Sequence, residues 1–296
     1  MKTIVMTGAT AGIGLVAAEQ MRQVPDVRLL LGARHPSTAG ADSLPLDLAR
    51  LASVRSFAAA VEQSLGETGI DGLVLNAGTQ FGNVDQRTED GLETTFAVNH
   101  LAHYLLLRLL MPRLAPGAVV VITTSDIHDP KAVPFASPEH ADAQKLVQGQ
   151  IRLNPKSRAS GLRAYATSKL CNLLTARALD SSAFARERGL HVIAFNPGPT
   201  PGTQLARNHS RGLKLLAAVL IPILTPILRL NAVADGGNLL ANLALGRIVP
   251  PAGRLYASQA KRRLTWPDPS ELARDDTVMA KLWRDSAALA GLPEHP

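Results

Sequence analysis

Tyr165 and Lys169 are the two residues whose types and spacing most directly suggest chemistry. They lie four positions apart, and leucines recur around them at helical spacing. Residues i and i+4 share one face of a helix, so the phenol and the ammonium are expected to lie together. A phenol has an ordinary pKa of about 10, and a nearby cation lowers that pKa. The spacing predicts an acid–base pair, although it is also frequent on helix faces without a catalytic role.

A glycine-rich turn follows the first predicted strand. Residues 7–14 read Thr-Gly-Ala-Thr-Ala-Gly-Ile-Gly, and a helix-forming stretch comes next. Gly8 suits a tight turn, Gly12 lets the backbone approach a pyrophosphate, and Gly14 allows close helix packing. Free N–H groups at the start of the helix would face the anion, with Thr10 and Ile13 inside the turn. The order of strand, turn and helix favours a dinucleotide site over an ordinary glycine loop.

The end of the second predicted strand indicates which dinucleotide would bind. Residues 31–35 read Leu-Gly-Ala-Arg-His and contain no acidic residue. Such an acid usually accepts hydrogen bonds from the adenosine ribose of NAD. Arg34 instead offers a planar guanidinium that suits a 2′-phosphate. The sequence therefore predicts NADP(H) rather than NAD(H), and the alternative is a solvated arginine at a strand end.

Short β-rich runs alternate with segments of helix length along the chain. Several runs, such as Val119-Val120-Val121-Ile122, are continuously apolar, as parallel strands buried on both faces require. The alternation predicts an α/β fold of the Rossmann type, with a doubly wound, mostly parallel sheet and helices on both faces. The runs that read as strands are Thr3–Met6, Val27–Leu31, Leu73–Asn76, Ala118–Thr123, His191–Phe195 and Arg254–Ala257.

Length and composition limit the classes of protein. The chain has 296 residues, of which 46% are hydrophobic, so one domain over residues 1–296 is expected, with an insertion at about 128–158. The net charge of +7 is scattered and aromatic residues make up 4%, which argues against nucleic acid. The single cysteine, Cys171, excludes an internal disulfide framework and suggests the cytoplasm. Histidines and acids between residues 128 and 142 match no metal-ligand spacing, so no metal is expected.

With these motifs in order, the chain resembles the short-chain dehydrogenase/reductase family from Thr7 to about residue 260. The match also includes Asp47-Leu48, Asn76-Ala77-Gly78 after the family's fourth strand, Asn99, a hydroxyl cluster ending the fifth strand, and Asn196-Pro197-Gly198 after the sixth. Chance agreement of so many ordered motifs is negligible. The resemblance implies an oxidoreductase that transfers hydride to or from a nicotinamide cofactor.

The resemblance also implies roles for the matching residues. Tyr165 would be the general acid in reduction and the general base in oxidation, and Lys169 would tune it and hold the nicotinamide ribose. Asn99 would support a water that links the lysine to solvent. Ser125 is our choice for the hydroxyl that polarises the carbonyl, with Thr124 as the alternative. The residues expected at the cofactor are Gly8, Thr10, Gly12, Ile13, Gly14, Arg34, Asp47, Leu48, Asn76, Ala77, Gly78, Tyr165, Lys169, Pro197, Gly198 and Thr203, with Thr200 as the alternative to Thr203.

The chain departs from compact family members between Ser125 and Tyr165. The interval is 40 residues, against about a dozen in compact members. With Asn99-His100-Leu101-Ala102-His103, it is similar to the branch containing retinol dehydrogenases and protochlorophyllide reductases. This implies a hydrophobic carbonyl or alcohol substrate, with light-dependent reduction and non-catalytic NADP(H) sensing as alternatives. Leu213–Leu230 is expected in a substrate lid at about 200–230 or at a membrane surface, and a homo-oligomer is compatible with each interpretation.

Overall fold

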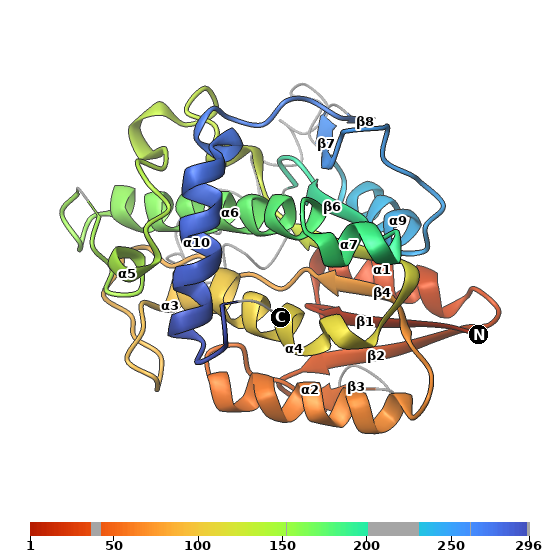
Figure 1. The fold of residues 1–296 in the computed structure, drawn as a ribbon. Helices are drawn as coiled ribbons and strands as arrows, with labels where there is room; N and C mark the ends of the chain where they lie inside the picture. Colours follow the sequence, from red (N-terminus) through yellow and green to blue (C-terminus); the bar gives the residue numbers. More distant parts are fainter. Residues whose placement is uncertain (37–42, 152, 201–230, 261, 295–296) are drawn as a thin grey trace.

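The computed structural model describes residues 1–36, 43–151, 153–200, 231–260 and 262–294. Within these ranges eight strands form one sheet in the order β3-β2-β1-β4-β5-β6-β7-β8, parallel except for the β7–β8 pair (Figure 1). The expected mostly parallel, doubly wound sheet is therefore confirmed. The strands are β1 (Lys2–Thr7), β2 (Val27–Ala33), β3 (Ser43–Pro45), β4 (Ile70–Leu75), β5 (Leu114–Thr123), β6 (His191–Asn196), β7 (Tyr256–Ala260) and β8 (Arg263–Thr265).

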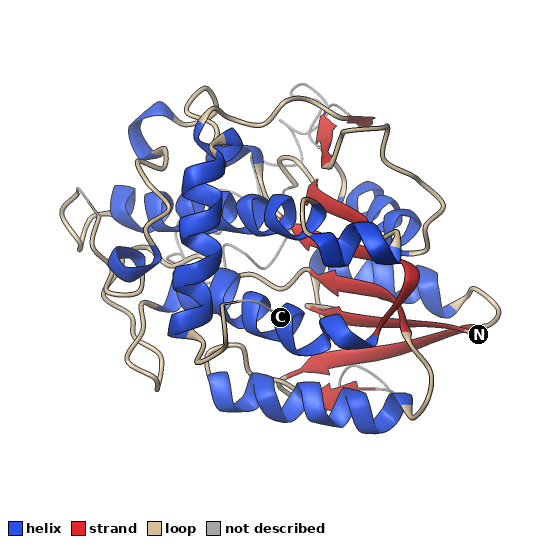
Figure 2. Ribbon diagram, in the orientation of Figure 1, coloured by secondary structure: helices blue, strands red, loops and turns tan. Residues whose placement is uncertain are grey.

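Helices cover both faces of the sheet (Figure 2). One face carries α1 (Gly12–Arg22) and α9 (Val233–Ala244), which pack on each other. The other face carries α2 (Leu51–Leu65), α4 (Ala102–Leu110) and α6 (Arg158–Asp180), and α10 (Asp276–Leu289) packs on α6. The shorter helices are α3 (Thr94–Phe96), α5 (Ala143–Leu146) and α7 (Ala183–Arg188), with a π-helical turn at Ala97–Leu101 and 3-10 turns at Met111–Arg113, Asp126–His128, Pro134–Ala136 and Leu272–Arg274.

Alternating side chains along each central strand divide the core into two layers. In β1, Ile4 and Met6 pack with α1 and α9, whereas Val5 packs with α2 and α4. In β5, Val121 and Ile122 divide in the same way. Successive side chains of a strand point to opposite faces, so a strand buried on both faces must be apolar at every position. This requirement explains the unbroken apolar runs in the sequence.

The structure differs from the predicted strands at the edges of the sheet and in the bounds of some central strands. Strands β3 and β8 were not predicted, because three residues are too few to show a period. The last predicted strand, Arg254–Ala257, is displaced, because β7 covers Tyr256–Ala260. Asn76 follows β4 instead of ending it. Each central strand overlaps its predicted apolar run, but β4 and β5 begin earlier than predicted, at Ile70 and Leu114.

The segment expected to be a surface insertion at about 128–158 is anchored in the structure. It contains α5 and a 3-10 turn, and it packs on α6 and α10. Ala136, Ala143 and Leu146 are buried. The described part of this segment is therefore more than a solvated excursion, because its apolar side chains contribute to the core.

No helix in the described ranges combines the length and the apolar character needed to cross a membrane. Leu213–Leu230 lies outside the described residues, as does the expected lid at about 200–230 apart from Thr200.

Candidate active site

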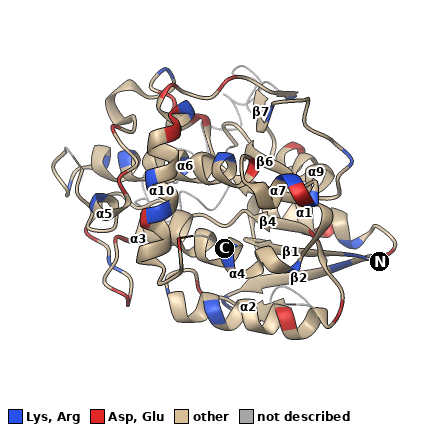
Figure 3. Ribbon diagram, in the orientation of Figure 1, with Lys and Arg blue, Asp and Glu red and all other residues tan. Residues whose placement is uncertain are grey.

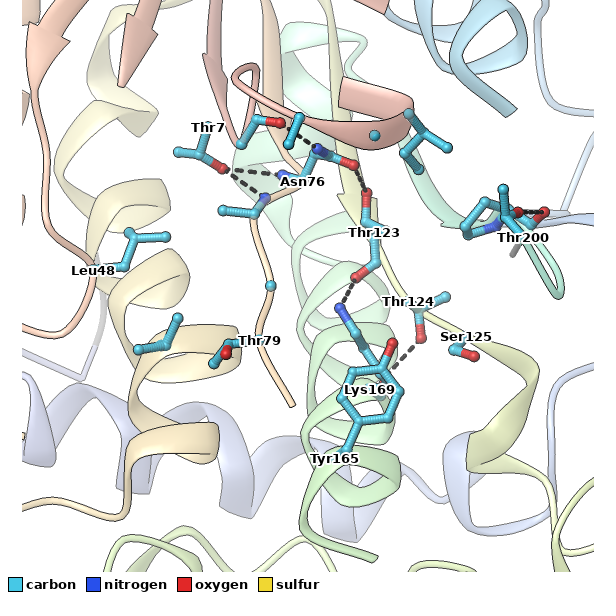
Figure 4. Close-up of a pocket in the computed structure, with 18 of the residues that line it drawn as sticks. Thr7, Leu48, Asn76, Thr79, Thr123, Thr124, Ser125, Tyr165, Lys169 and Thr200 are labelled. Atoms are coloured by element: carbon cyan, nitrogen blue, oxygen red, sulfur yellow. Dashed lines mark hydrogen bonds between the residues drawn. The ribbon is translucent and has the colours of Figure 1, made fainter. Parts of the chain in front are cut away.

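A cavity of about 660 Å³ opens at the carboxyl ends of the central strands. It extends from Arg34, just after β2, to Tyr165 and Lys169 on α6 and Ser125 after β5. Figure 4 shows the end of the cavity that contains Ser125, Tyr165 and Lys169. Ligands of doubly wound sheets bind outside the carboxyl ends of the strands, where the strand order reverses. Here the reversal lies between β1 and β4. The fold therefore joins residues separated by more than a hundred positions in the sequence.

The glycine turn between β1 and α1 is tightly packed. Gly8 has a φ of +73°, and a side chain at Gly14 would bring its Cβ to 2.0 Å from the Gly8 carbonyl oxygen. The first turn of α1 contains no acidic residue, and the side chain of its N-cap residue, Ala11, forms no capping hydrogen bond. Its N–H groups and positive dipole end therefore suit an anion such as a pyrophosphate. The residues present fit a dinucleotide.

Thr7 connects this turn to the floor of the cavity. Its oxygen accepts the backbone N–H groups of Asn76 and Ala77, both at 3.1 Å. Its hydroxyl hydrogen is therefore available to His103 Nε2, which lies 2.9 Å away. Because Nε2 accepts, the neutral His103 ring carries its hydrogen on Nδ1. Nδ1 donates that hydrogen to the Asn99 carbonyl at 3.1 Å. Burial lowers the pKa of His103 to about 4, which keeps the ring neutral. Sequence reasoning assigned no role to Thr7 or His103.

A second hydrogen-bonded chain links the floor to α6. Asn76 Nδ2 donates to the Gly8 carbonyl at 3.2 Å, and its Oδ1 accepts the Thr123 hydroxyl at 3.1 Å. The Thr123 carbonyl in turn accepts Lys169 Nζ at 3.1 Å and Asn172 Nδ2 at 3.0 Å (Figure 4). The end of β5 therefore positions Lys169. Thr123 was named at the sequence level only as part of the hydroxyl cluster.

Tyr165 and Lys169 share one face of α6, as their spacing predicts. Tyr165 is 8% exposed and Lys169 is 2% exposed, and Lys169 Nζ lies 5.6 Å from the centre of the Tyr165 ring. Burial lowers the pKa of Lys169 to about 8. Burial, and after it the negative charge of Asp126, raises the pKa of Tyr165 above its ordinary value. The predicted lowering of the tyrosine pKa by the lysine is therefore absent here, because desolvation of the phenolate dominates.

The neighbouring hydroxyls Thr124 and Ser125 have different surroundings. Thr124 is buried, and its hydroxyl donates to the Lys169 carbonyl at 2.7 Å. Ser125 is partly exposed, and its hydroxyl reaches Asp126 Oδ1 at 3.3 Å. The Thr124 hydroxyl hydrogen is committed to the backbone of α6. The Ser125 hydrogen has a longer bond to an adjacent side chain, and the Ser125 oxygen accepts the Ile127 N–H at 3.4 Å. Ser125 is therefore the more accessible of the two hydroxyls, and its bond is the easier one to exchange for a ligand.

Asn99 lies behind the cavity rather than in its lining. It sits in the π-helical turn before α4, and its amide bonds to both the N–H (2.8 Å) and the carbonyl (2.9 Å) of Thr79, and donates to the Ser168 hydroxyl at 3.0 Å. Its backbone carbonyl accepts a hydrogen bond from His103 Nδ1. The side chain thus fixes Thr79, which does line the cavity.

Most of the other residues expected at the cofactor line this cavity. Gly14 does not, because its part is to allow the close approach of α1, and Thr203 lies outside the described residues. Thr200 lines the cavity and donates to the Gly198 carbonyl at 3.1 Å. The predicted cofactor residues in the lining are Gly8, Thr10, Gly12, Ile13, Arg34, Asp47, Leu48, Asn76, Ala77, Gly78, Tyr165, Lys169, Pro197 and Gly198.

The fold and the cavity together define a dinucleotide-binding α/β protein, and sequence comparison identifies its family. Residues 2–135 match the family model described as short chain dehydrogenase. A Bos taurus protein named dehydrogenase/reductase SDR family member 13 is 34% identical, covering 98% of this chain and 74% of that protein. Protochlorophyllide reductase A of Hordeum vulgare is 28% identical, and the match covers 98% of this chain and 80% of that protein. The chain belongs to the short-chain dehydrogenase/reductase family, oxidoreductases that bind a nicotinamide cofactor.

Solved structures agree with this assignment. The crystal structure of an uncharacterized protein from Mycobacterium Paratuberculosis has a TM-score of 0.69 and 25% identity, and the match covers 100% of this chain and 96% of that one. The 3-ketoacyl-(acyl-carrier-protein) reductase of Brucella melitensis, complexed with NADH, has a TM-score of 0.55 at 19% identity, covering 82% and 90%. The second likeness concerns the fold alone.

Proposed function

We propose that the protein is an NADPH-dependent carbonyl reductase or, in reverse, an alcohol dehydrogenase, acting on a hydrophobic small molecule. The observation that carries the proposal is the single cavity that joins Arg34 and the glycine turn to Tyr165, Lys169 and Ser125. Anion-binding and proton-transferring groups therefore line one space. Hydride transfer beside a proton donor requires this arrangement.

Arg34 supports NADP(H) as the cofactor. The side chain is exposed and lines the cavity, and no carboxylate occurs in residues 31–36. Asp47 and Leu48 would contact the adenine, and Asn76 to Gly78 would form the floor beneath the dinucleotide. When bound, the nicotinamide supplies or accepts the hydride.

Tyr165, Ser125 and Lys169 would have separate tasks in reduction. The raised pKa keeps Tyr165 protonated at neutral pH, so its hydroxyl holds a proton for the carbonyl oxygen. The Ser125 hydroxyl would donate a hydrogen bond to the same oxygen. Lys169 would hold the nicotinamide ribose, and Asn99 would act as a positioning residue through Thr79 and Ser168.

The character of the cavity lining supports an apolar substrate. Phe81, Val98, Ile127, Val133 and Pro199 contribute apolar surface to it. Such side chains favour burial of apolar ligand surface, while a few hydroxyls fix its orientation. The 28% identity to protochlorophyllide reductase A of Hordeum vulgare supports a large, conjugated or apolar carbonyl compound as the proposed substrate.

A substrate screen tests the proposed function. NADPH oxidation is followed by absorbance with panels of aldehydes, ketones and quinones of rising hydrophobicity, in darkness and in light. Turnover in darkness, with kcat/KM rising with apolar surface, is the expected result. A protein that binds NADPH and turns over no carbonyl would support the sensing alternative, and turnover only in light would support photoreduction.

Arg34→Ala is expected to weaken NADP(H) binding about 10- to 100-fold, because a charge-assisted hydrogen bond to phosphate is lost. NAD(H) affinity should change less than about twofold, since NAD(H) has no 2′-phosphate. Isothermal titration with both coenzymes measures the difference. Arg50→Ala, at an exposed arginine paired with Glu89 outside the cavity, controls for the loss of one positive charge. Equal losses for the two coenzymes would refute the role of Arg34.

Ser125→Ala and Thr124→Val are expected to have opposite consequences. Ser125→Ala should lower kcat about 10²-fold, in the range seen when one oxyanion donor is removed, with little change in stability. Thr124→Val should destabilise the protein by about 1–3 kcal/mol, because the buried Lys169 carbonyl loses its hydroxyl donor, and should reduce kcat less. Steady-state kinetics and thermal unfolding separate the two. The reverse pattern would assign the reacting hydroxyl to Thr124.

We also infer that the substrate is a small molecule and not a nucleic acid. In the view of Figure 3, lysines and arginines are interspersed with acids along the elements drawn. Cys171 is free and buried, which supports a reducing compartment, the cytoplasm.

Membrane contact through residues 213–230 and a homo-oligomer remain part of the proposal.

A further inference from the structure

Asp126 places a carboxylate at the substrate end of the cavity. It begins the 3-10 turn Asp126–His128, directly after Ser125, and it is only partly buried. The Ser125 hydroxyl donates to its Oδ1 at 3.3 Å, and both residues line the cavity. Among the residues that the structure describes, no lysine or arginine forms an ion pair with this carboxylate.

The other charged groups in the lining are less accessible than Asp126 from the part of the cavity beside Ser125. Arg34 and Asp47 line the far end, beyond the glycine turn. Lys169 is 2% exposed, and its ammonium donates to the Thr123 carbonyl. The carboxylate is therefore the charge most accessible from the open part of the cavity beside Ser125.

The negative charge of Asp126 also reaches the proton donor. After burial, this charge is the second cause that raises the pKa of Tyr165. The same charge raises the pKa of Tyr256 in β7. It also raises the pKa of His128 in its own turn, which burial lowers. The field of Asp126 thus extends to the place where a carbonyl oxygen would meet the Tyr165 hydroxyl.

We propose that Asp126 is a specificity-determining residue, which rejects substrates that carry a carboxylate or phosphate near the reacting carbonyl. This inference rests on the proposed reductase function and adds a substrate class to it: neutral apolar carbonyl compounds. The net charge of +7 would attract anions to the protein as a whole, so their exclusion requires a local negative charge. A like charge in a partly desolvated site is repelled far more strongly than one in bulk water.

The test compares two aldehydes of one shape, 4-formylbenzoate and its methyl ester. For each protein the ratio of kcat/KM for the ester to that for the carboxylate is measured by NADPH oxidation. Asp126→Asn keeps the size of the side chain and an oxygen that accepts the Ser125 hydroxyl. The variant should lower the ratio at least about tenfold, because the repulsion is removed. Using a ratio cancels any general loss of activity.

Asp129→Asn is the matched control. Asp129 follows the same turn and its Oδ1 accepts the Lys131 N–H, but it does not line the cavity. The change in net charge is identical, and the ratio should stay within about twofold of the wild-type value. An equal ratio in the wild-type protein and Asp126→Asn would overturn the inference, as would an equal fall in both variants.

A binding experiment separates this inference from the proposed function. If the wild-type protein reduces neither aldehyde, isothermal titration of its NADPH complex with the same pair gives the ratio of dissociation constants. A ratio that falls in Asp126→Asn and not in Asp129→Asn supports the role of Asp126 even where turnover is absent. Absence of turnover with all carbonyl compounds counts against the reductase function alone, and an unchanged binding ratio counts against Asp126 alone.

Discussion

Tyr165→Phe is expected to lower kcat for carbonyl reduction about 10²- to 10⁴-fold, because it removes the proton donor and nothing else. Among the hydrogen bonds between described residues, none involves the Tyr165 hydroxyl, so folding stability should change little. The aromatic ring remains, and with it the packing beside Lys169. NADPH affinity should therefore persist, which isothermal titration measures alongside steady-state kinetics.

Tyr104→Phe is the matched control for this loss of a hydroxyl. Tyr104 is a buried tyrosine of α4 whose hydroxyl donates to the Trp283 carbonyl at 2.9 Å and accepts Arg108 Nη1 at 2.6 Å. Its variant should lose stability and keep its kcat. In addition, Tyr165→Phe/Ser125→Ala should lose scarcely more activity than the worse single variant, as residues acting as one unit do. Near-normal turnover by folded Tyr165→Phe would exclude the mechanism.

Lys169→Met is expected to lower kcat about 10²-fold and also to raise folding stability by about 2 kcal/mol at pH 7. Lowering the pKa of Lys169 from 10.5 to about 8 corresponds to a free-energy penalty of roughly 3 kcal/mol for the buried, charged ammonium. Loss of the hydrogen bond to Thr123 offsets part of this gain, but the Thr123 carbonyl still accepts Asn172 Nδ2. NADPH binding should weaken too, since Lys169 would hold the nicotinamide ribose.

The pH dependence of unfolding gives a second measurement for Lys169. Below pH 8 Lys169 is protonated in both the folded and the unfolded chain. The folded state then bears the whole free-energy cost of burying the ammonium. Between about pH 8 and 10.5 the unfolded chain binds more protons, so the Lys169 contribution to wild-type stability rises with pH across this window. Lys169→Met should lack this rise. Lys156→Met, which replaces an exposed lysine, should retain the rise in stability with pH. A difference in unfolding free energy between the wild-type protein and Lys169→Met that stays constant with pH would contradict the expectation.

The central part of the fold was predictable because its signals are local. The apolar runs of β1, β4, β5 and β6 are dictated by burial on both faces of the sheet, and the glycine turn by the close approach of α1. The edge strands β3 and β8 were not predictable, because a strand of three residues is too short to show an alternating pattern of side chains. The order β2-β1-β4 was not predicted, because no local pattern records which strands become neighbours.

The candidate site was predictable in its residue types and less so in its electrostatics. The spacing of Tyr165 and Lys169 placed both on one helix face. Their pKa values depend on burial and on Asp126, a residue 39 positions from Tyr165 that carried no motif. The lysine was therefore expected to dominate the tyrosine pKa, whereas desolvation does.

The sequence by itself determined the family, the order of its motifs and the chemistry available at each of them, because these reside in short patterns of residue type and spacing. Only the tertiary structure decided the hydrogen bonds of two adjacent hydroxyls, with Thr124 bonded to the backbone of α6 and Ser125 to the neighbouring Asp126. It also decided that His103 joins Thr7 to the Asn99 carbonyl, and that Asp126 faces the substrate end. The physical reason is that hydrogen-bond partners, desolvation and charge–charge distances depend on contacts between segments far apart in the chain.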